Sequence, residues 1–529
     1  MRVFIICCLS VIFHVDHLWA QAHDTLAMRY ARSIKSEQLA KHVFTLASDD
    51  FEGRETGTPG IEKAAQYIST YYESIQMQQA TPGSWFQLYP LRKESNLGSY
   101  AEHSGKRRNF MDDFYFFGMD GQVVKANELV FAGYGIRDER HNDYKGWKPK
   151  SSGFGMICLN GEPMDAKGRS RITGSNETSD WNDDVMLKAE AAEKAGAAFL
   201  LVVNTNYDMY MKRVRYWLEQ APIRLERDKE TAEVAHIPVI FISPAFANAL
   251  IQSSGKTIEE VQVKLNKGKR VKPLTVATEV VFHVEQKRER LEAKNVMAFV
   301  EGSDPALKNE IVVVSAHYDH IGIMNGQINN GADDDASGTS ATMEIAEAFQ
   351  LAKKEGHGPK RSVLILHVSG EEKGLLGSEW YSDHPIFPLA NTVCDLNIDM
   401  IGRTDIEHAA DSNYIYLIGS DKLSTDLHKI SEDCNAKYCN VKLDYTYNSP
   451  NDPNRFYYRS DHYNFAKHNI PVIFYFSGVH EDYHKPGDDA KKIAYKKMEQ
   501  ITRLVFHTAW EVANRAEKLK VDVISDFKN

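Results

Sequence analysis

The sequence lacks several features that would decide a protein's class by themselves. It has no polybasic stretch, and its 63 Lys and Arg against 73 Asp and Glu give a net charge of −10. A strongly basic nucleic-acid-binding protein is therefore excluded as the default. Gly (33) and Pro (17) are too scarce for a collagen-like or low-complexity chain. The mean hydropathy of −0.44 excludes a polytopic membrane protein. With 43% hydrophobic and 26% charged residues, the 529-residue chain has globular composition and length for about three domains.

Residues 3–13 form the one marked apolar run, preceded by Arg2 and followed by Ala20 and Ala22. This pattern predicts a secretory signal peptide, residues 1–20, cleaved after Ala20 or Ala22. The run is too short to span a bilayer, and an N-terminus that is disordered or buried in the core is the alternative. We expect an exported protein, periplasmic or extracellular, with no membrane attachment after cleavage. Export permits disulfides; it would favour pairing of Cys434 with Cys439, and free buried thiols are the open alternative.

Hydrophobic periodicity divides the rest of the chain into two textures. A helix is expected from Thr58-Pro59-Gly60, whereas residues 121–271 alternate short apolar runs with polar loops around one helix at 185–195. Beyond Asn295, buried runs at 311–314, 363–366, 393–398, 414–418 and 472–476 alternate with helical patterns, among them 339–354 and 498–512. This order predicts a three-layer α/β domain with a mostly parallel central sheet.

Ionisable side chains follow every one of these buried runs except 414–418. Because ligands bind beyond the carboxyl ends of parallel strands, these side chains are expected to meet at one edge. Each of these ionisable groups alone is typical of a solvated turn or a structural residue, but together they favour a metal cluster. Imidazole with carboxylate suits Zn²⁺, with Co²⁺ or Mn²⁺ as substitutes, and five ligands for two ions require one shared carboxylate. The side chains are His317, Asp319 and His320, the run Asp333 to Asp335, Glu371 and Glu372, Asp399, and His484.

The strings HYD (317–319), GADDDASG (331–338), SGEEKGLLGSEWY (369–381), NIDMIGR (397–403) and YHKPGDD (483–489) occur in this order. Together they closely resemble metallopeptidase family 28, the co-catalytic dizinc exopeptidases that include bacterial leucyl aminopeptidase and aminopeptidase Y. The resemblance covers most of residues 295–508 and implies the zinc-exopeptidase fold with two Zn²⁺ ions per chain.

The resemblance also implies residue roles. Asp334 would bridge both metals, with His317 and Asp399 completing one site and Glu372 and His484 the other. The neighbouring histidines His320 and His480 are disfavoured as ligands by motif register.

Three further residues receive roles from the resemblance. Glu371 falls on the general-base position, Tyr483 on that of an oxyanion-binding tyrosine, and Asp319 on that of a carboxylate that orients the first histidine. Asp488 is expected either to orient His484 or to lie in a solvated turn. Ser460-Asp461-His462 does not form a hydrolase relay, because three consecutive side chains cannot line up as one.

The phrase EGRETGTPG (52–60) resembles the start of the same catalytic domain, so this domain is expected to be split between residues 21–120 and 276–529. Residues 121–275 would then be an inserted, β-rich α/β module. It resembles a protease-associated domain through VFAGYGI (130–136), DYKG (143–146), GEP (161–163), KAEAAEKAGAAFLLVV (188–203) and HIPV (236–239). Such modules are non-catalytic lids or substrate-binding surfaces in relatives.

These inferences predict a secreted zinc aminopeptidase that acts on peptide or protein N-termini, with no nucleic-acid partner. A carboxypeptidase or dipeptidase on the same scaffold is an open alternative. A glutaminyl cyclase and a receptor-like binding protein are disfavoured because the five-ligand set is intact. The sequence does not define the oligomeric state.

Overall fold

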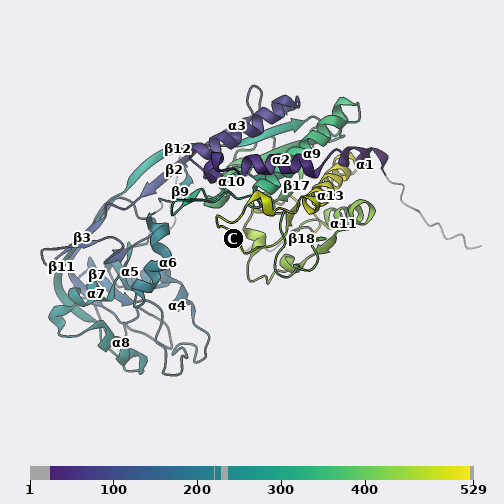
Figure 1. The fold of residues 1–529 in the computed structure, drawn as a ribbon. Helices are drawn as coiled ribbons and strands as arrows, with labels where there is room; N and C mark the ends of the chain where they lie inside the picture. Colours follow the sequence, from purple (N-terminus) through teal and green to yellow (C-terminus); the bar gives the residue numbers. More distant parts are fainter. Residues whose placement is uncertain (1–23, 220, 228–235, 525–529) are drawn as a thin grey trace, which may run out of the picture. The chain divides into compact units, whose positions relative to one another are not determined.

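The computed structural model describes residues 24–219, 221–227 and 236–524 (Figure 1). The predicted signal peptide, residues 1–20, lies outside the described residues. Among the helices of the described part, none combines the length and apolar character needed to cross a membrane. The chain divides into two compact units, one made of residues up to Tyr89 and from Ala293 onward, the other of Pro90–Glu292.

The first unit is built on a mixed sheet whose central strands are parallel. Their order is β20-β17-β13-β16, and antiparallel neighbours flank them: β18 pairs with β20, and β12 pairs with β16. The predicted α/β fold is confirmed: the four central strands are parallel, their neighbours β18 and β12 run antiparallel to them, and β19 at one edge pairs parallel with β18. The bounds are β12 (Lys287–Val300), β13 (Ile311–His317), β16 (Ser362–Val368), β17 (Thr392–Ile398), β18 (Tyr414–Ile418), β19 (Lys442–Asp444) and β20 (Val472–Phe476).

Helices cover both faces of this sheet, which explains why the central strands read as continuous apolar runs. In β13, Val312 and Val314 join the core beneath α2, α9 and α13, whereas Ile311 and Val313 join the core beneath α10 and α12. Alternate residues of a strand point to opposite faces, so a strand covered on both sides needs apolar residues throughout. The helices are α1 (Thr25–Ala31), α2 (Ser36–Leu46), α3 (Pro59–Ser74), α9 (Ala336–Lys354), α10 (Leu376–Asp383), α11 (Thr425–Cys434), α12 (His462–Ala466) and α13 (Tyr495–Asn514).

The second unit carries an eight-stranded sheet of order β4-β3-β11-β6-β7-β8-β10-β5. It is wider than the predicted 121–275 module because strands upstream and downstream of those limits pair inside it. β3 (Tyr100–His103) pairs with β11 (Leu274–Val284), and β5 (Phe114–Tyr115) pairs with β10 (Val239–Ile242). The predicted helix at 185–195 is α5 (Val185–Lys194). β9 (Ile223–Leu225) stands outside this sheet and pairs with β2 (Phe86–Ser95). The unit also contains β4 (Lys106–Asn109), β6 (Gln122–Phe131), β7 (Phe154–Leu159), β8 (Ala197–Val203), α4 (Asp180–Asp183), α6 (Tyr207–Glu219), α7 (Pro244–Leu250) and α8 (Ile258–Asn266).

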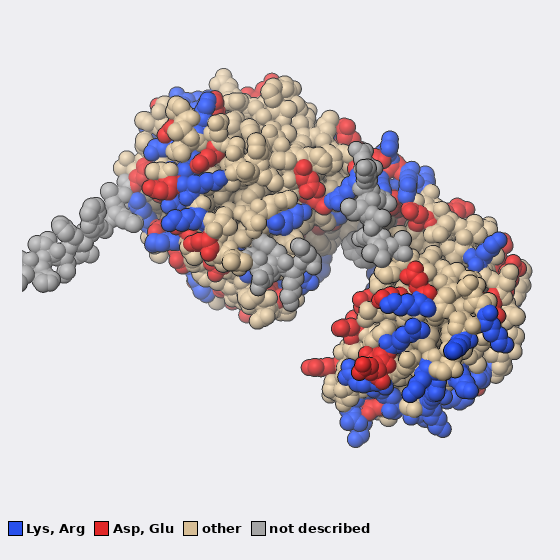
Figure 2. Space-filling model, turned by 180° about the vertical axis from the view of Figure 1, so that it is seen from behind, with Lys and Arg blue, Asp and Glu red and all other residues tan. Residues whose placement is uncertain are grey.

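The described residues answer one question that the sequence left open, the pairing of the cysteines. Cys158, Cys394, Cys434 and Cys439 are all free thiols, so the alternative without a Cys434–Cys439 disulfide holds. On the face shown in Figure 2, basic and acidic side chains are interspersed, in keeping with the mixed charge of the sequence.

Candidate metal centre

The ends of the central strands bring the predicted ligands to one edge of the sheet. His317 is the last residue of β13, Asp399 follows β17, and Asp334 lies two residues before α9. Glu371 and Glu372 form a short turn after β16, and His484 lies in the loop after β20. The turn after β16 requires glycine at position 370, where φ is 72° and a Cβ atom would lie 3.0 Å from the Leu376 Cβ atom.

Asp334 lies at the centre of this arrangement. Its Oδ1 atom is 3.3 Å from His317 Nε2, and its Oδ2 atom is 3.2 Å from His484 Nε2. The Oδ1 atom of Asp399 lies 3.5 Å from His317 Nε2, and the Oε2 atom of Glu372 lies 3.2 Å from His484 Nε2. The five predicted residues therefore form two imidazole–carboxylate groups that share one carboxylate.

The unpaired polar atoms of these groups fit a metal. Within the described residues, His317 Nε2, His484 Nε2 and Asp334 Oδ2 are buried atoms that make no hydrogen bond. An unsatisfied buried polar group costs about 1–3 kcal/mol, so several converging on one spot call for a ligand. Zinc–nitrogen and zinc–oxygen bonds of about 2.0–2.1 Å put tetrahedral ligand atoms about 3.3 Å apart, close to the spacings observed.

His320 is a member of the cluster that the motif register had set aside. Its ring is fully buried, with Nδ1 2.8 Å from Glu372 Oε1 and 3.6 Å from Asp334 Oδ2. His480, the other neighbour set aside, lies apart: its Nε2 atom is 3.4 Å from Asp333 Oδ2. The sequence offers one clue to this difference. His320 lies three residues after His317, a predicted ligand at the end of β13, whereas β20, the strand before His480, does not end in a predicted ligand.

Two separate groups of three side chains could each hold an ion, and the second has His320 where the resemblance implied His484. The groups are His317, Asp335 and Asp399, and His320, Asp334 and Glu372. Asp335 is the weaker choice because its carboxylate already caps α9. Its Oδ1 atom accepts hydrogen bonds from the main-chain N–H groups of Gly338 (2.7 Å) and Met400 (3.2 Å). The Oδ2 atoms of Asp334 and Asp335 both lack a hydrogen bond, but Asp334 is the better shared ligand because its two oxygens face two different imidazoles, those of His317 and His484.

Asp319 supports the site through three contacts. Its main-chain carbonyl lies 3.1 Å from His317 Nδ1, while its carboxylate is 3.8 Å from the same nitrogen. The carboxylate instead accepts hydrogen bonds from the Thr56 hydroxyl (2.9 Å) and the Glu371 N–H (3.2 Å). With Nδ1–H donated to the carbonyl, the lone pair of His317 Nε2 faces Asp334 and Asp399.

The sequence Ser460-Asp461-His462 is divided among separate contacts. The Ser460 hydroxyl donates to Asp399 Oδ2 at 2.7 Å, Asp461 accepts from Ser378, and His462 stacks on Phe474 with ring centroids 4.8 Å apart.

Asp488 is occupied differently from either expectation. Its carboxylate accepts the main-chain N–H groups of Asp333 (3.0 Å) and Asp334 (3.1 Å), and so fixes the loop that presents the shared carboxylate.

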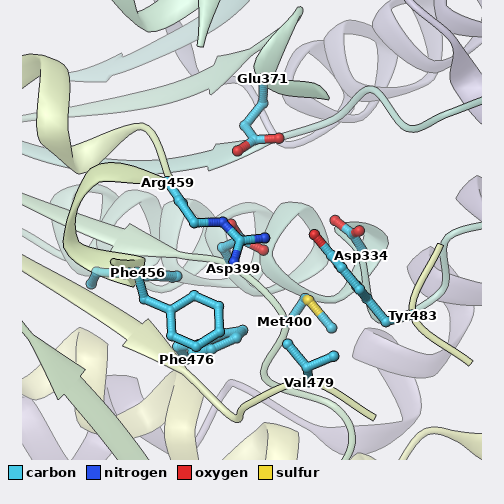
Figure 3. Close-up of a pocket in the computed structure, with 10 residues that line it drawn as sticks. Asp334, Glu371, Asp399, Met400, Phe456, Arg459, Phe476, Val479 and Tyr483 are labelled. Atoms are coloured by element: carbon cyan, nitrogen blue, oxygen red, sulfur yellow. The ribbon is translucent and has the colours of Figure 1, made fainter. Parts of the chain in front are cut away.

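A pocket opens onto the cluster and is lined by Asp334, Asp399, Glu371, Tyr483 and Arg459 above an apolar floor (Figure 3). The floor consists of Met400, Phe456, Phe474, Phe476 and Val479. Burial, reinforced by Asp334 and Glu372, raises the pKa of Tyr483, so its hydroxyl remains a hydrogen-bond donor. Burial also raises the pKa of Glu371 in the metal-free protein, and the neighbouring Glu372 and Asp399 act in the same direction.

Residues 295–509 match the sequence model of Peptidase family M28. The resemblance predicted from the motifs is thereby confirmed, and this M28 segment contains all five predicted ligands. A probable leucine aminopeptidase of Trichophyton verrucosum is 30% identical over 217 residues, 40% of this chain and 56% of that protein.

Two further relatives and one solved structure extend the comparison. Aminopeptidase YwaD of Bacillus subtilis is 27% identical over 40% of this chain and 43% of its own length. A probable glutamate carboxypeptidase of Arabidopsis thaliana is 28% identical over 34% of this chain and 24% of its own length. The chain thus spans less than two thirds of these curated relatives. The aminopeptidase from Aneurinibacillus sp. strain AM-1 shares the fold, with 17% identity, a TM-score of 0.54 and coverage of 94% of this chain and 98% of that one.

Proposed function

We propose that the protein is an exported zinc-dependent aminopeptidase that removes N-terminal residues from peptides. The observation that carries the proposal is the pair of imidazole–carboxylate groups sharing Asp334 at a pocket that Glu371 also lines. The M28 segment and the aminopeptidases among the relatives support the same activity.

The residues would hold two zinc ions. His317 and Asp399 would bind one, Glu372 and His484 the other, and Asp334 both. When bound, the ions would polarise the scissile carbonyl and lower the pKa of the attacking water.

The chain's own side chains complete the chemistry. Glu371 makes no ion pair with His317 or His484 among the described residues. It takes the proton from the attacking water and passes it to the leaving amine. The Tyr483 hydroxyl, stacked on His484 with ring centroids 3.9 Å apart, donates a hydrogen bond to the oxyanion. Asp319 keeps His317 oriented and anchors the main chain of Glu371.

The proposal includes the remaining organisation of the chain. Residues 1–20 act as a signal peptide, and the catalytic part consists of the chain on either side of an inserted protease-associated module. The unit Pro90–Glu292 is this non-catalytic module.

The test is hydrolysis of amino-acid 4-nitroanilides, N-acetylated peptides and peptides with a free C-terminus, with chelator and after zinc is restored. Chelator-sensitive release that requires a free amino end supports the proposal. Cleavage of N-acetylated peptides from the carboxyl end would establish a carboxypeptidase instead. No hydrolysis of any substrate with two zinc ions bound would exclude an exopeptidase of either kind.

A further inference from the structure

Arg459 is the only cation among the ten residues that line the pocket of the metal centre. It follows the single helical turn Phe456–Tyr458, and its main-chain N–H donates to the Phe456 carbonyl at 3.0 Å. The guanidinium lies 4.9 Å above the ring of Phe456. In Figure 3 this side chain extends into the pocket, between Glu371 and the aromatic floor.

The guanidinium of Arg459 makes no ion pair among the described residues. Two of the three acids that line the pocket, Asp334 and Asp399, instead face the imidazole of His317. With metal bound, the charges of Asp334, Glu372 and Asp399 would be neutralised by the ions. Glu371 would then be the remaining anion of the pocket, and the proposed chemistry requires it as a base. Arg459 would therefore face a pocket whose net field favours an anion.

We propose that Arg459 is a specificity-determining residue that selects substrates carrying a carboxylate close to the scissile bond. A guanidinium binds a carboxylate with two parallel hydrogen bonds, and the floor formed by Met400, Phe456 and Phe476 accepts the methylene groups that precede it. The carboxylate belongs either to the side chain of an N-terminal Glu or Asp or to the C-terminus of a dipeptide. This inference rests on the proposed peptidase activity.

The experiment compares matched substrates that differ only in charge, using the full-length zinc-loaded protein. One arm measures kcat/KM for Glu- and Gln-4-nitroanilide, and the other for Leu-Leu and Leu-Leu amide. At least one carboxylate substrate is expected to exceed its neutral partner by about 10–100-fold, the range of a charge-assisted hydrogen bond. In Arg459→Met this ratio falls to about 1, and the change is largely in KM.

The matched control is Arg455→Met. Arg455, like Arg459, lies over an aromatic ring, in its case 4.8 Å above that of Tyr458. It does not line the pocket, so its substitution leaves the ratio as in the wild type. Dependence on Arg459 in the first arm assigns the acidic side chain, and dependence in the second assigns the dipeptide terminus. Ratios near 1 in both arms, or ratios that Arg459→Met leaves intact, overturn the inference while hydrolysis itself persists. Absence of all hydrolysis refutes the proposed function instead.

Discussion

Glu371 and Glu372 are adjacent in sequence but face different partners. The Oε2 atom of Glu372 lies 3.2 Å from His484 Nε2, whereas Glu371 lines the pocket. Glu371→Gln is therefore expected to retain both metals and to lower kcat by about 10²–10⁴-fold, because only the proton acceptor is removed. Turnover and metal content, measured on the same sample, test this. Unchanged turnover would remove Glu371 as the base, and loss of metal would make it a ligand.

Asp334 has one carboxylate oxygen facing His317 and the other facing His484. Asp334→Ala is expected to abolish binding of both ions, whereas His484→Ala retains one. The matched control is His480→Ala, since His480 faces Asp333 and Asp488 and should leave two ions bound. Elemental analysis after dialysis gives the stoichiometry. Two ions in Asp334→Ala would rule out the shared-ligand arrangement.

His462 is a buried neutral histidine whose stability contribution depends on pH. Burial lowers its pKa from 6.5 to about 3, because the charged ring would lose its hydration. Above pH 6.5 both folded and unfolded states hold it neutral, and its contribution is complete. As the pH falls from 6.5 toward 3, only the unfolded state gains the proton, so the free energy of unfolding decreases.

His462→Phe removes this dependence while keeping an aromatic ring against Phe474. Between pH 7.5 and pH 5, the wild type is expected to lose about 2 kcal/mol more unfolding free energy than the variant. Denaturant titrations in chelator at both pH values measure the difference. Parallel pH curves would show that His462 takes up a proton in the folded state.

Arg54 joins the two loops that present the ligands. It is fully buried and donates to the main-chain carbonyls of Leu46, Tyr318, Asn330 and Gly331 at 2.6–2.9 Å. Lysine has three donors at one atom and cannot reproduce this fork. Arg54→Lys is expected to reduce the free energy of unfolding by about 3 kcal/mol and to weaken zinc binding.

The control for this effect is Arg361→Lys. Arg361 is equally buried and donates to the carbonyls of Val512, Arg515 and Ala516, away from the metal centre. It should destabilise the fold without changing zinc affinity. If Arg54→Lys changed stability alone, Arg54 would have no role in positioning the ligand loops.

Buried strands of the first unit were predictable because both faces are covered. The bounds of β18 and β20 coincide with the apolar runs 414–418 and 472–476, and the two sides of β13 enter two different cores. The antiparallel direction of β18 and β12 was not predictable, since an apolar run does not state which way its partner runs. The width of the second unit was not predictable either, because β3 and β11 pair residues about 180 positions apart in sequence, and only folding shows that they pair.

The five proposed ligands were predictable from the order of the sequence motifs, but the groups that lie next to them in the structure were not. His320 and His480 each lie a few residues from a ligand, and only the path of the chain after β13 and β20 separates them. Similarly, the contact of His317 with Asp319 uses the main-chain carbonyl, which every residue carries and no motif records.

The division into two units predicts how the whole protein unfolds. All proposed metal ligands belong to the unit containing the M28 segment, while Pro90–Glu292 has hydrophobic clusters of its own. A ligand stabilises only the cooperative unit that binds it, by about 2.7 kcal/mol at 100 times its dissociation constant. Calorimetry is therefore expected to resolve two transitions, of which zinc raises one by about 5 °C and leaves the other in place.

Hydrogen exchange assigns the two transitions. In chelator, amides of β13, β16 and β17 should lose protection at a lower temperature than in zinc, whereas those of β6, β7 and β8 should exchange equally in both conditions. The amides of these two strand sets are buried in separate cores, so they report each unit independently. A single transition in which zinc protects both strand sets alike would mean that the units unfold as one, and that metal binding stabilises the unit Pro90–Glu292 as well.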